Sequence, residues 1–249
     1  MTTLIAWGSI LQDYPAINSS SPLVADRLNL CGGENARVVR RRQSRRVAHF
    51  LLSQLMKKAG ENSNLLDNIY RSASDRPQLP ISYMDFNISH SGDWVAVVLN
   101  IIKPAAYQEG QPHKNVAVGI DIESPQKERN FSALLRHFAA PEEIAWFEEQ
   151  ANAEAAFYRI WCLREALLKS QGAGIAKLSE VRHNPLQQRM YSRHCPMGRQ
   201  LFSAELPFYF SVFVAGEALS NAHFFQWQSN CLQEKNLNAG IEYLVNLAP

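Results

Sequence analysis

The segment FYRIWCLREALLK, residues 157–169, organises the rest of this chain. Strong helix formers dominate it, and apolar side chains recur at steps of three and four residues, which predicts a helix with one buried face. On another face Trp161, Glu165 and Lys169 follow one another at four-residue steps, so an indole, a carboxylate and an ammonium share one stripe. Taken alone, the pattern is typical of a charged surface helix with one half-buried tryptophan. Two other segments favour a functional role.

Length and composition set broad limits on the fold. The 249 residues suffice for one large domain or for two of roughly 100 to 150 residues each. Hydrophobic residues make up 46% of the chain, which is enough for a sizeable core. The 25 basic and 23 acidic side chains give a net charge of +2, so local charge clusters say more about partners than the total does.

The segment FNISHSGDW, residues 86–94, precedes the apolar run 95–99. Small polar side chains and a histidine before a buried strand predict a turn that holds an anion. Backbone N–H groups, the Ser89 hydroxyl and the His90 imidazole can all donate to a phosphate. The pattern has little specificity by itself.

The segment VAVGIDIE, residues 116–123, is typical of a strand because β-branched residues dominate it. Alternation puts Asp121 and Glu123 on one face, while Ile120 and Ile122 point into the core. Two neighbouring carboxylates repel each other unless a cation lies between them. A few oxygen ligands that leave room for substrate phosphates are what magnesium prefers. The alternative is a pair of ordinary carboxylates at the end of a strand.

A basic segment, residues 37–46, runs into apolar positions with helical spacing, and Gly60 marks the expected end of that helix. Such a run is usually the solvated face of a helix, and the next most common interpretation is a nucleic-acid-binding patch. No interleaved aromatic residues, zinc-ligand spacing or helix-turn-helix pattern accompanies it, so we expect no nucleic-acid partner.

Several features favour a cytoplasmic protein. The four cysteines, Cys31, Cys162, Cys195 and Cys231, lack C-x-x-C spacing and are expected to be reduced thiols. The first residues show no signal-peptide pattern, and no apolar run reaches the roughly 20 residues that span a bilayer, so we expect no membrane partner. His194 adjoins Cys195 without a second pair of metal-ligand type, so no zinc site is predicted.

In chain order, the patterns predict a helix followed by strands, and then helices followed by strands again. This order predicts an α+β fold with a structural duplication, divided into an N-terminal half at 1–118, a C-terminal half at 119–225 and an extension at 226–249. The polar segment 103–115 is longer than a hairpin needs and is expected to be a surface insertion. The predicted strands include 2–10, 69–72, 95–102, 116–123, 178–183, 200–204, 207–215 and 223–227, and the predicted helices include 131–138, 141–150 and 152–170.

Three motifs together point to a family. They are F-N-I-S-H-S-G-x-W at 86–94, G-I-D-I-E at 119–123 and W-C-L-R-E-A-L-L-K at 161–169. Their order and spacing resemble the signature set of the 4′-phosphopantetheinyl transferases, in their larger, monomeric, internally duplicated class. The resemblance extends from about Arg37 to about Arg182. It implies a monomer with two similar α/β halves, related by a pseudo-two-fold duplication, and an active site in the cleft between them.

The resemblance also implies a reaction. A serine hydroxyl of an acyl or peptidyl carrier protein would attack the β-phosphate of coenzyme A, accept the 4′-phosphopantetheine arm and release adenosine 3′,5′-bisphosphate. Such a phosphoryl transfer depends mainly on positioning and charge neutralisation. The carriers of fatty-acid, polyketide and nonribosomal peptide biosynthesis are equally compatible with the sequence.

The resemblance assigns roles to individual residues. Asp121, Glu123 and Glu165 would bind magnesium, which bridges the pyrophosphate. Glu165 would also be the general base for the serine, directly or through water. Lys169 and His90 would neutralise phosphate oxygens. The residues implied in coenzyme binding are Arg41, Arg42, Arg45, Arg76, Ser89, His90 and Lys169.

Arg45, with Arg41 and Arg42 behind it, is the best match for a ligand of the 3′-phosphate. Three other positions depart from the family pattern. Arg76 stands where a lysine commonly reaches the phosphates, and a charged turn residue is an equally good interpretation. Arg164 also replaces a usual lysine and is expected to keep a charge that faces phosphate. His49 stands where a small residue is common, and its bulk would change how the basic helix packs against the coenzyme.

Two other functions fit the same residues. A magnesium-dependent phosphohydrolase would use the carboxylates with water as the nucleophile, and it would consume coenzyme A without a carrier. A carrier-protein-binding module without catalysis would keep its function when Asp121 is replaced.

Overall fold

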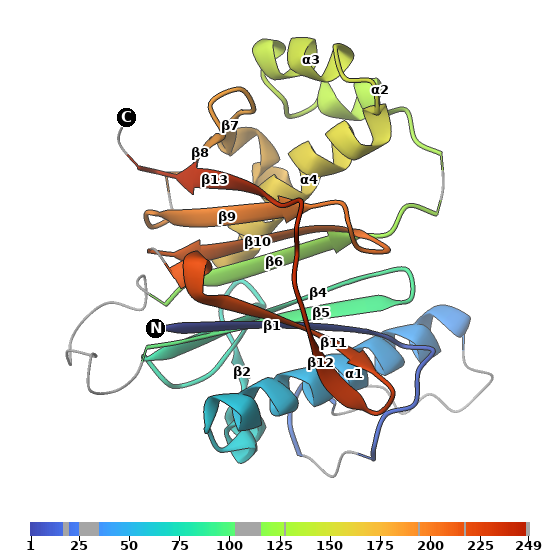
Figure 1. Ribbon diagram of the computed structural model, residues 1–249, viewed down its shortest axis with the longest axis vertical. Coiled ribbons are helices and arrows are strands. Elements are labelled where there is room, and N and C mark those ends of the chain that lie inside the picture. Colours follow the sequence, from blue (N-terminus) through green and yellow to red (C-terminus); the bar gives the residue numbers. More distant parts are fainter. Residues whose placement is uncertain are drawn as a thin grey trace.

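In the residues that it describes, a computed structural model of the protein contains two large β-sheets, a two-stranded ribbon and the helices that cover the sheets (Figure 1). It describes residues 1–16, 20–24, 35–102, 116–126, 128–193, 195–216 and 218–247. The mixture of helices and strands confirms the predicted α+β class. The predicted insertion at 103–115 lies outside the described residues, as do Cys31 and His194.

The first sheet has five strands in the order β12-β11-β1-β5-β4. They are β1 Thr2–Ser9, β4 Met84–Ser91, β5 Trp94–Ile101, β11 Ala222–Gln228 and β12 Cys231–Lys235. The central strand β1 is antiparallel to β5 and parallel to β11. β4 and β5 form a hairpin that turns at Gly92 and Asp93, and Gly92 has a φ of 57°, which glycine adopts without strain.

The second sheet has six strands in the order β6-β10-β9-β13-β8-β7. They are β6 Val118–Glu123, β7 Arg182–Asn184, β8 Arg189–Tyr191, β9 Gly198–Ser203, β10 Tyr209–Ala215 and β13 Ile241–Val245. A separate two-stranded ribbon consists of β2 Tyr70–Arg71 and β3 Pro77–Gln78. In the two large sheets, β6 is an edge strand of the second sheet and β4 is an edge strand of the first.

Two long helices have the ends that their sequences predict. The side chain of Asn35 caps α1 Ala36–Ala59, and Gly60 follows it in a left-handed conformation. Asn152 caps α4 Ala153–Ser170. The remaining helices are α2 Phe131–Leu135, α3 Pro141–Glu148 and the short 3-10 helices η1 Ser63–Asn68, η4 Ile175–Glu180 and η5 Ala218–Asn221. Among the described residues, no helix combines the length and apolarity needed to cross a membrane.

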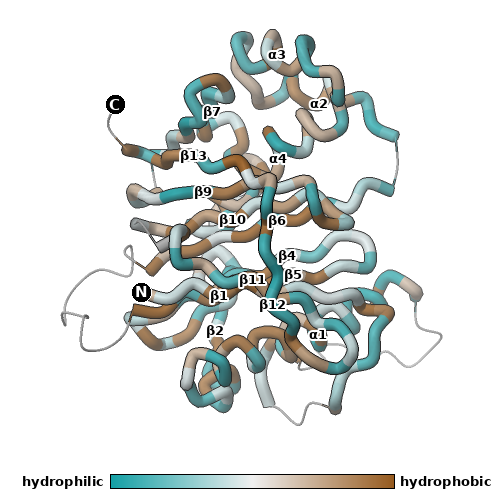
Figure 2. The backbone as a smooth tube through the Cα atoms, viewed as in Figure 1, coloured by the Kyte–Doolittle hydropathy of each residue, from teal (hydrophilic) through white to brown (hydrophobic). Residues whose placement is uncertain are grey.

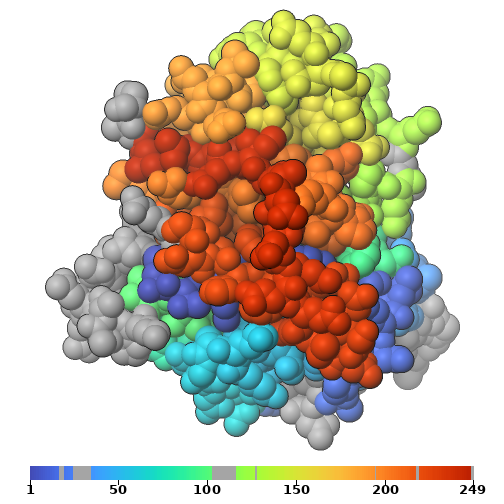
Figure 3. Space-filling view, viewed as in Figure 1, coloured from blue at the N-terminus to red at the C-terminus, as the bar shows by residue number. Residues whose placement is uncertain are grey.

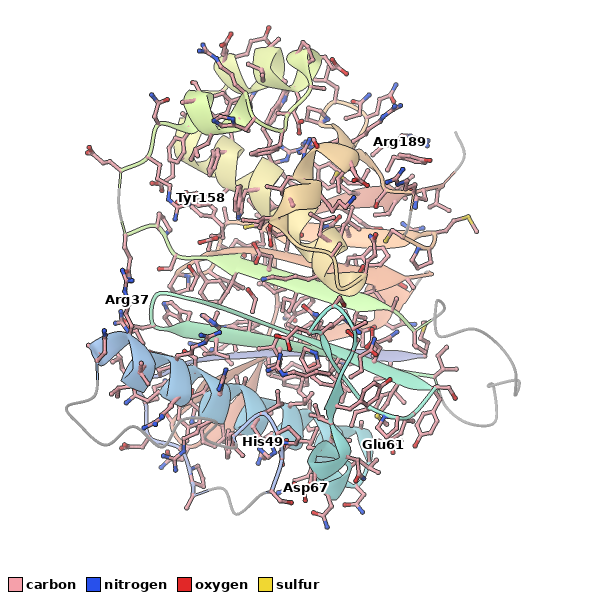
Figure 4. The ribbon with its side chains drawn as sticks, turned by 180° about the vertical axis from the view of Figure 1, so that it is seen from behind. Arg37, His49, Glu61, Asp67, Tyr158 and Arg189 are labelled. Atoms are coloured by element: carbon pink, nitrogen blue, oxygen red, sulfur yellow. The ribbon has the colours of Figure 1, made fainter. Side chains whose placement is uncertain are left out.

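Each sheet carries one long helix on one face, and the other faces of both sheets share a core. Apolar residues of α1 pack on the first sheet, and those of α4 pack on the second. The shared core includes Ile5, Val98, Ile120 and Val212. Figure 4 shows α1, which begins near Arg37, and α4, which carries Tyr158, in front of the sheets. In Figure 2 hydrophobic residues concentrate along the central strands.

The C-terminal segment belongs to both sheets. β11 and β12 extend the first sheet beside β1, whereas β13 pairs with β9 and β8 in the second. Figure 3 shows this segment, in red, crossing from the lower to the upper part of the molecule. The sheets therefore cross the predicted boundary at residue 225, and the division into two halves and an extension stays a prediction.

β4 and β6 are joined by side chains at the junction of the two sheets. Alternate side chains of β4 accept hydrogen bonds from alternate backbone N–H groups along β6. The pairs are Asp85 with Val118, Asn87 with Ile120, Ser89 with Ile122 and Ser91 with Ser124, at 3.0, 3.2, 3.2 and 3.0 Å. Because alternate side chains of a strand point the same way, one polar face of β4 can satisfy the edge of β6.

The structure corrects the turn predicted at 86–94, because residues 86–91 belong to β4 and only Gly92 and Asp93 form the turn. The anion-binding role predicted for Ser89 and His90 stays a prediction. The strand predicted at 178–183 is also wrong in its first part, because η4 extends to Glu180 and β7 begins at Arg182. A short apolar run does not distinguish a strand from a helical turn.

Candidate active site

The site forms where α4 packs directly on β6. A Cβ atom on Gly119 would lie 1.9 Å from the carbonyl oxygen of Ala166 and 2.8 Å from the backbone nitrogen of Ser170. Only glycine allows this approach, which brings Glu165 and Lys169 of α4 beside the end of β6. The D-x-E of G-I-D-I-E can be recognised in the sequence, whereas the packing role of Gly119 leaves no signal there.

Asp121 is at the centre of the site and is only 3% exposed. Its Oδ1 accepts a hydrogen bond from the Ser89 hydroxyl at 3.1 Å and lies 2.5 Å from the Lys169 ammonium. Its Oδ2 is buried and has no hydrogen-bond partner among the described residues. A buried carboxylate oxygen without a donor is costly, so a cation at this position would be stabilising.

Two more carboxylates lie close to Asp121. Burial, followed by the charge of Asp121, raises the pKa of Glu165 to about 7, although Lys169 opposes the shift. Its Oε1 is buried and lacks a hydrogen-bond partner within the described part of the chain. Burial and the charge of Asp121 also raise the pKa of Glu123, although the Ser91 hydroxyl donates to its Oε2 at 2.9 Å. The three carboxylates therefore repel one another.

Lys169 partly offsets this repulsion. Its Nζ donates to Asp121 and, at 2.9 Å, to the Ser89 hydroxyl, and its side chain is 29% exposed. Burial lowers the pKa of this ammonium, but the charge and hydrogen bond of Asp121 and the charge of Glu165 raise it overall. Lys169 therefore stays protonated with one end of its side chain accessible from solvent.

Positive groups converge on the exposed side of β4. Desolvation lowers the pKa of His90, and the charges of Lys169, Arg41 and Arg45 lower it further, whereas Asp121 opposes them. These interactions place two arginines of α1 near the same strand that carries His90. Arg42 is half-buried on that helix. An anion bound here would face several donors at once.

The donor set suits a metal ion that needs few protein ligands. Two buried carboxylate oxygens lack donors, which suits a hard cation. Among the described residues, however, no three His, Cys, Asp or Glu side chains converge as a complete metal-binding group. Magnesium keeps several water or phosphate ligands and needs only one or two protein carboxylates, so the residues present fit this ion.

Comparison with known proteins agrees with this geometry. A model of the 4′-phosphopantetheinyl transferase superfamily matches residues 117–205, which contain β6 and α4. A protein of Haemophilus influenzae, whose name places it among the 4′-phosphopantetheinyl transferases, is 47% identical over 246 residues, 99% of this chain and 100% of that protein. The chain belongs to the 4′-phosphopantetheinyl transferase superfamily.

Other transferases match a shorter region. The 4′-phosphopantetheinyl transferase AcpT of Salmonella typhimurium is 33% identical over 98 residues, 39% of this chain and 44% of that protein. The 4′-phosphopantetheinyl transferase psf-1 of Bacillus pumilus is 34% identical over 92 residues, 36% of this chain and 33% of that protein. The resemblance recognised from the three motifs and the enzyme class are thus confirmed.

In this transferase the phosphate-facing role predicted for Arg164 is wrong. The side chain is 1% exposed and its guanidinium donates to both carboxylate oxygens of Glu143, at 2.7 and 2.5 Å. Glu143 also bonds the buried imidazole of His183. Burial raises the pKa of Glu143, but the bonds from His183 and Arg164 outweigh it and lower the pKa overall. The cluster ties α3 and β7 to α4.

Two other residues that were predicted to affect coenzyme binding are buried within the protein. Arg76 is 8% exposed and donates to several protein oxygens at the junction of the sheets. His49 is buried on the part of α1 near Asp67, as Figure 4 shows, and burial lowers its pKa. The effect predicted for His49 on coenzyme packing stays a prediction.

Proposed function

We propose that the chain transfers the 4′-phosphopantetheine arm of coenzyme A to a serine of an acyl or peptidyl carrier protein, with magnesium as the metal ion. The products are the holo carrier protein and adenosine 3′,5′-bisphosphate. One observation carries the proposal: β4, β6 and α4 gather carboxylates with unsatisfied buried oxygens next to Lys169 and His90. Membership of the transferase family supports it.

The proposed reaction exchanges one phosphorus–oxygen bond for another. The serine oxygen forms a bond to the β-phosphorus of coenzyme A. The bond from that phosphorus to the bridging oxygen breaks, and its electron pair leaves with adenosine 3′,5′-bisphosphate. When bound, magnesium would neutralise charge on the pyrophosphate oxygens, and Asp121, Glu123 and Glu165 are the residues that would hold it.

Lysine, arginine and histidine side chains would hold the coenzyme in place. Lys169 and His90 lie where they can donate to pyrophosphate oxygens, and Ser89 orients the Lys169 ammonium through its hydroxyl. Arg45 and Arg41 would bind the 3′-phosphate, with Arg42 behind them on α1. Their charges already act on His90, which supports a shared anion site. We do not assign Arg76 to phosphate.

Glu165 is the proposed general base. A base works best when its pKa is near the operating pH, and burial raises the pKa of Glu165 to about 7. With its buried Oε1 toward the metal ion, the carboxylate would take the proton that the attacking serine hydroxyl loses through its other oxygen, directly or through water. A carboxylate with the usual low pKa would be a weaker base for this step.

The resemblance to the larger transferase class leads us to propose two similar halves with the active site in the cleft between them. The side-chain ladder between β4 and β6 is consistent with such a junction. Because both contributing strands come from one chain, we propose that a monomer in the cytoplasm is active. Its carrier would belong to fatty-acid, polyketide or nonribosomal peptide biosynthesis, and no nucleic acid would be required.

Intact-mass spectrometry of an apo carrier protein, incubated with this protein, coenzyme A and magnesium, tests the proposal. We expect a mass gain of about 340 Da, the size of the arm that this phosphoryl transfer delivers. The gain should disappear with Glu165→Gln and persist with Glu148→Gln, a matched change at an exposed glutamate of α3. No gain with carriers from all three kinds of pathway would contradict the proposal.

The same mixtures separate the alternative functions. A phosphohydrolase would consume coenzyme A when no carrier is present, whereas a transferase should leave it intact. A binding module would co-elute with the carrier protein in gel filtration without modifying it. Asp121→Ala would leave that co-elution unchanged. Chromatography of the coenzyme and of the carrier in parallel therefore assigns one of the three functions.

A further inference from the structure

Arg76 connects three elements at the junction between the sheets. Its Nε donates to the backbone oxygen of Lys169 at 3.0 Å, at the end of α4. Its Nη2 lies 2.8 Å from Asp85 Oδ2, 3.1 Å from the Phe86 oxygen of β4 and 3.2 Å from the Val118 oxygen of β6. A single guanidinium thus contacts α4 and the two edge strands.

The ion pair with Asp85 extends the ladder between β4 and β6. Asp85 Oδ2 accepts the Val118 backbone N–H at 3.0 Å as well as the Arg76 guanidinium. Both side chains are largely buried, at 7% and 14% exposed. Removing one partner of a buried ion pair leaves an uncompensated charge, so Arg76 and Asp85 depend on each other. Together they hold β4 and β6 in their observed register.

A second contact joins the same loop to the end of α4. Gly172, just after the helix, has a φ of 68°, and a Cβ atom there would lie 2.3 Å from the Ser74 hydroxyl and 3.4 Å from the Arg76 Cβ. The chain leaving α4 therefore packs directly against residues 74–76. Because Lys169 is in the last turn of α4, the position of its backbone depends on this loop.

We propose that Arg76 is a positioning residue for Lys169 rather than a ligand of the coenzyme's phosphates. It holds the last turn of α4 against β4 and β6, so that the Lys169 ammonium meets Asp121 and Ser89. Asp85 supports this arrangement by pairing with Arg76. The inference rests on the proposed transferase function, because it concerns the same ammonium.

The two roles differ in their response to the coenzyme's 3′-phosphate. A residue that binds this phosphate loses its importance when 3′-dephospho-coenzyme A is the substrate. A residue that positions Lys169 is equally important with either substrate. Small displacements of a reacting group can cost about 10- to 100-fold in rate, so the effect should appear mainly in kcat.

Steady-state kinetics of carrier modification with both coenzymes tests the inference. Arg76→Gln and Asp85→Asn should each lower kcat about 10- to 100-fold with both substrates, with KM for the coenzyme within about twofold of wild type. Their effects should not add in the double variant, because both break one network. Arg182→Gln, at an exposed arginine of β7 outside this network, is the matched control and should leave both constants unchanged.

Arg45→Ala provides the contrasting result, because its penalty should largely vanish with 3′-dephospho-coenzyme A. The inference would be overturned if Arg76→Gln behaved in the same way, or if it raised KM while kcat stayed constant. If Arg76→Gln does not fold, as judged by circular dichroism, Asp85→Asn decides between the roles by the same ratios. A wild-type protein that modifies no carrier would instead contradict the proposed function.

Discussion

The hydroxyl of Ser89 makes hydrogen bonds to several groups of the polar site. It donates to Asp121, accepts from the Lys169 ammonium and accepts from the Ile122 backbone N–H. A hydroxyl group offers one donor and two acceptor positions on a single rotatable oxygen atom. Its place on β4 also fixes which part of α4 lies opposite Asp121.

Ser89→Ala should leave the fold largely intact and lower the transfer rate about 10- to 100-fold. Lys169 would lose the hydroxyl that orients it, and a hydrogen bond to a charged group is worth about 1.5 to 3 kcal/mol. Ser132→Ala, on α2, should leave the rate unchanged. Carrier modification timed by mass spectrometry measures both rates, and equal rates for the two variants would contradict the role given to Ser89.

At the scale of elements, the decisive feature is the contact between α4 and β6. Glu165 and Lys169 belong to the helix, whereas Asp121 and Glu123 belong to the strand. Their side chains meet because Gly119 lets the helix backbone approach the strand. The order of the carboxylates along the chain could be read from the sequence, but this approach could not.

Gly119→Ala should lower the free energy of unfolding by about 1 to 3 kcal/mol or more and abolish most activity, because a new methyl group would push α4 away from β6. The comparison is Gly174→Ala, where a Cβ atom would meet nothing within 4 Å. Urea unfolding followed by circular dichroism gives both values. Wild-type stability of the Gly119 variant would contradict the packing described.

At the scale of the whole molecule, the last strands hold distant parts of the chain together. Trp227 of β11 is buried against Phe50 of α1, with ring centroids 4.7 Å apart, and it stacks on Tyr14 at 5.7 Å. Its indole N–H donates to the Asp13 backbone oxygen at 3.1 Å. The C-terminal segment therefore completes the core of the first sheet.

Trp227→Ala should destabilise the protein by about 3 to 5 kcal/mol, the usual cost of deleting a large buried aromatic side chain. Unfolding should remain a single transition if the last strands fold together with the first sheet. Leu186→Ala is the control, because that side chain is 83% exposed. Urea titration detects either result, and an early, separate transition would indicate that the C-terminal segment is an independent unit.

The stability of the whole molecule should also depend on pH through His183. Burial lowers the pKa of this imidazole, the bond to Glu143 opposes the shift, and the charges of Arg164 and Arg159 add to it. In the unfolded chain this imidazole has its ordinary pKa of 6.5. The unfolded chain therefore binds more protons than the folded one below about pH 7. Acidification from this pH should favour unfolding, before Glu143 begins to titrate.

His183→Asn should make the unfolding free energy less dependent on pH. The difference in slope should be at most about 1.4 kcal/mol per pH unit between pH 7 and pH 5, the contribution of one proton. The imidazole N–H toward Glu143 is replaced by an amide donor, so the ion pair of Glu143 with Arg164 is kept. Urea titrations at several pH values test this, and parallel curves for the two proteins would rule out His183 as the source.

Much of the local structure could be predicted from sequence. Helix formers and apolar spacing gave α4 its length, Asn152 and Gly60 mark helix ends, and alternation placed Asp121 beside Glu123. These features depend on neighbours within a few residues, which the sequence shows directly. The three motifs were enough to recognise the family because each keeps its own spacing.

The sequence by itself determined most of the helices and strands, the family and the residue types of the site. Only the tertiary structure decided that Arg164 is buried against Glu143, that Arg76 bonds the end of α4, and that the polar residues of β4 satisfy the edge of β6. A cation's partner is set by which element packs against it, and partners that are 21 and 93 residues away leave no periodic pattern in the chain. The positions of the charged residues could be read from the sequence, but the partner that each charged side chain contacts could not.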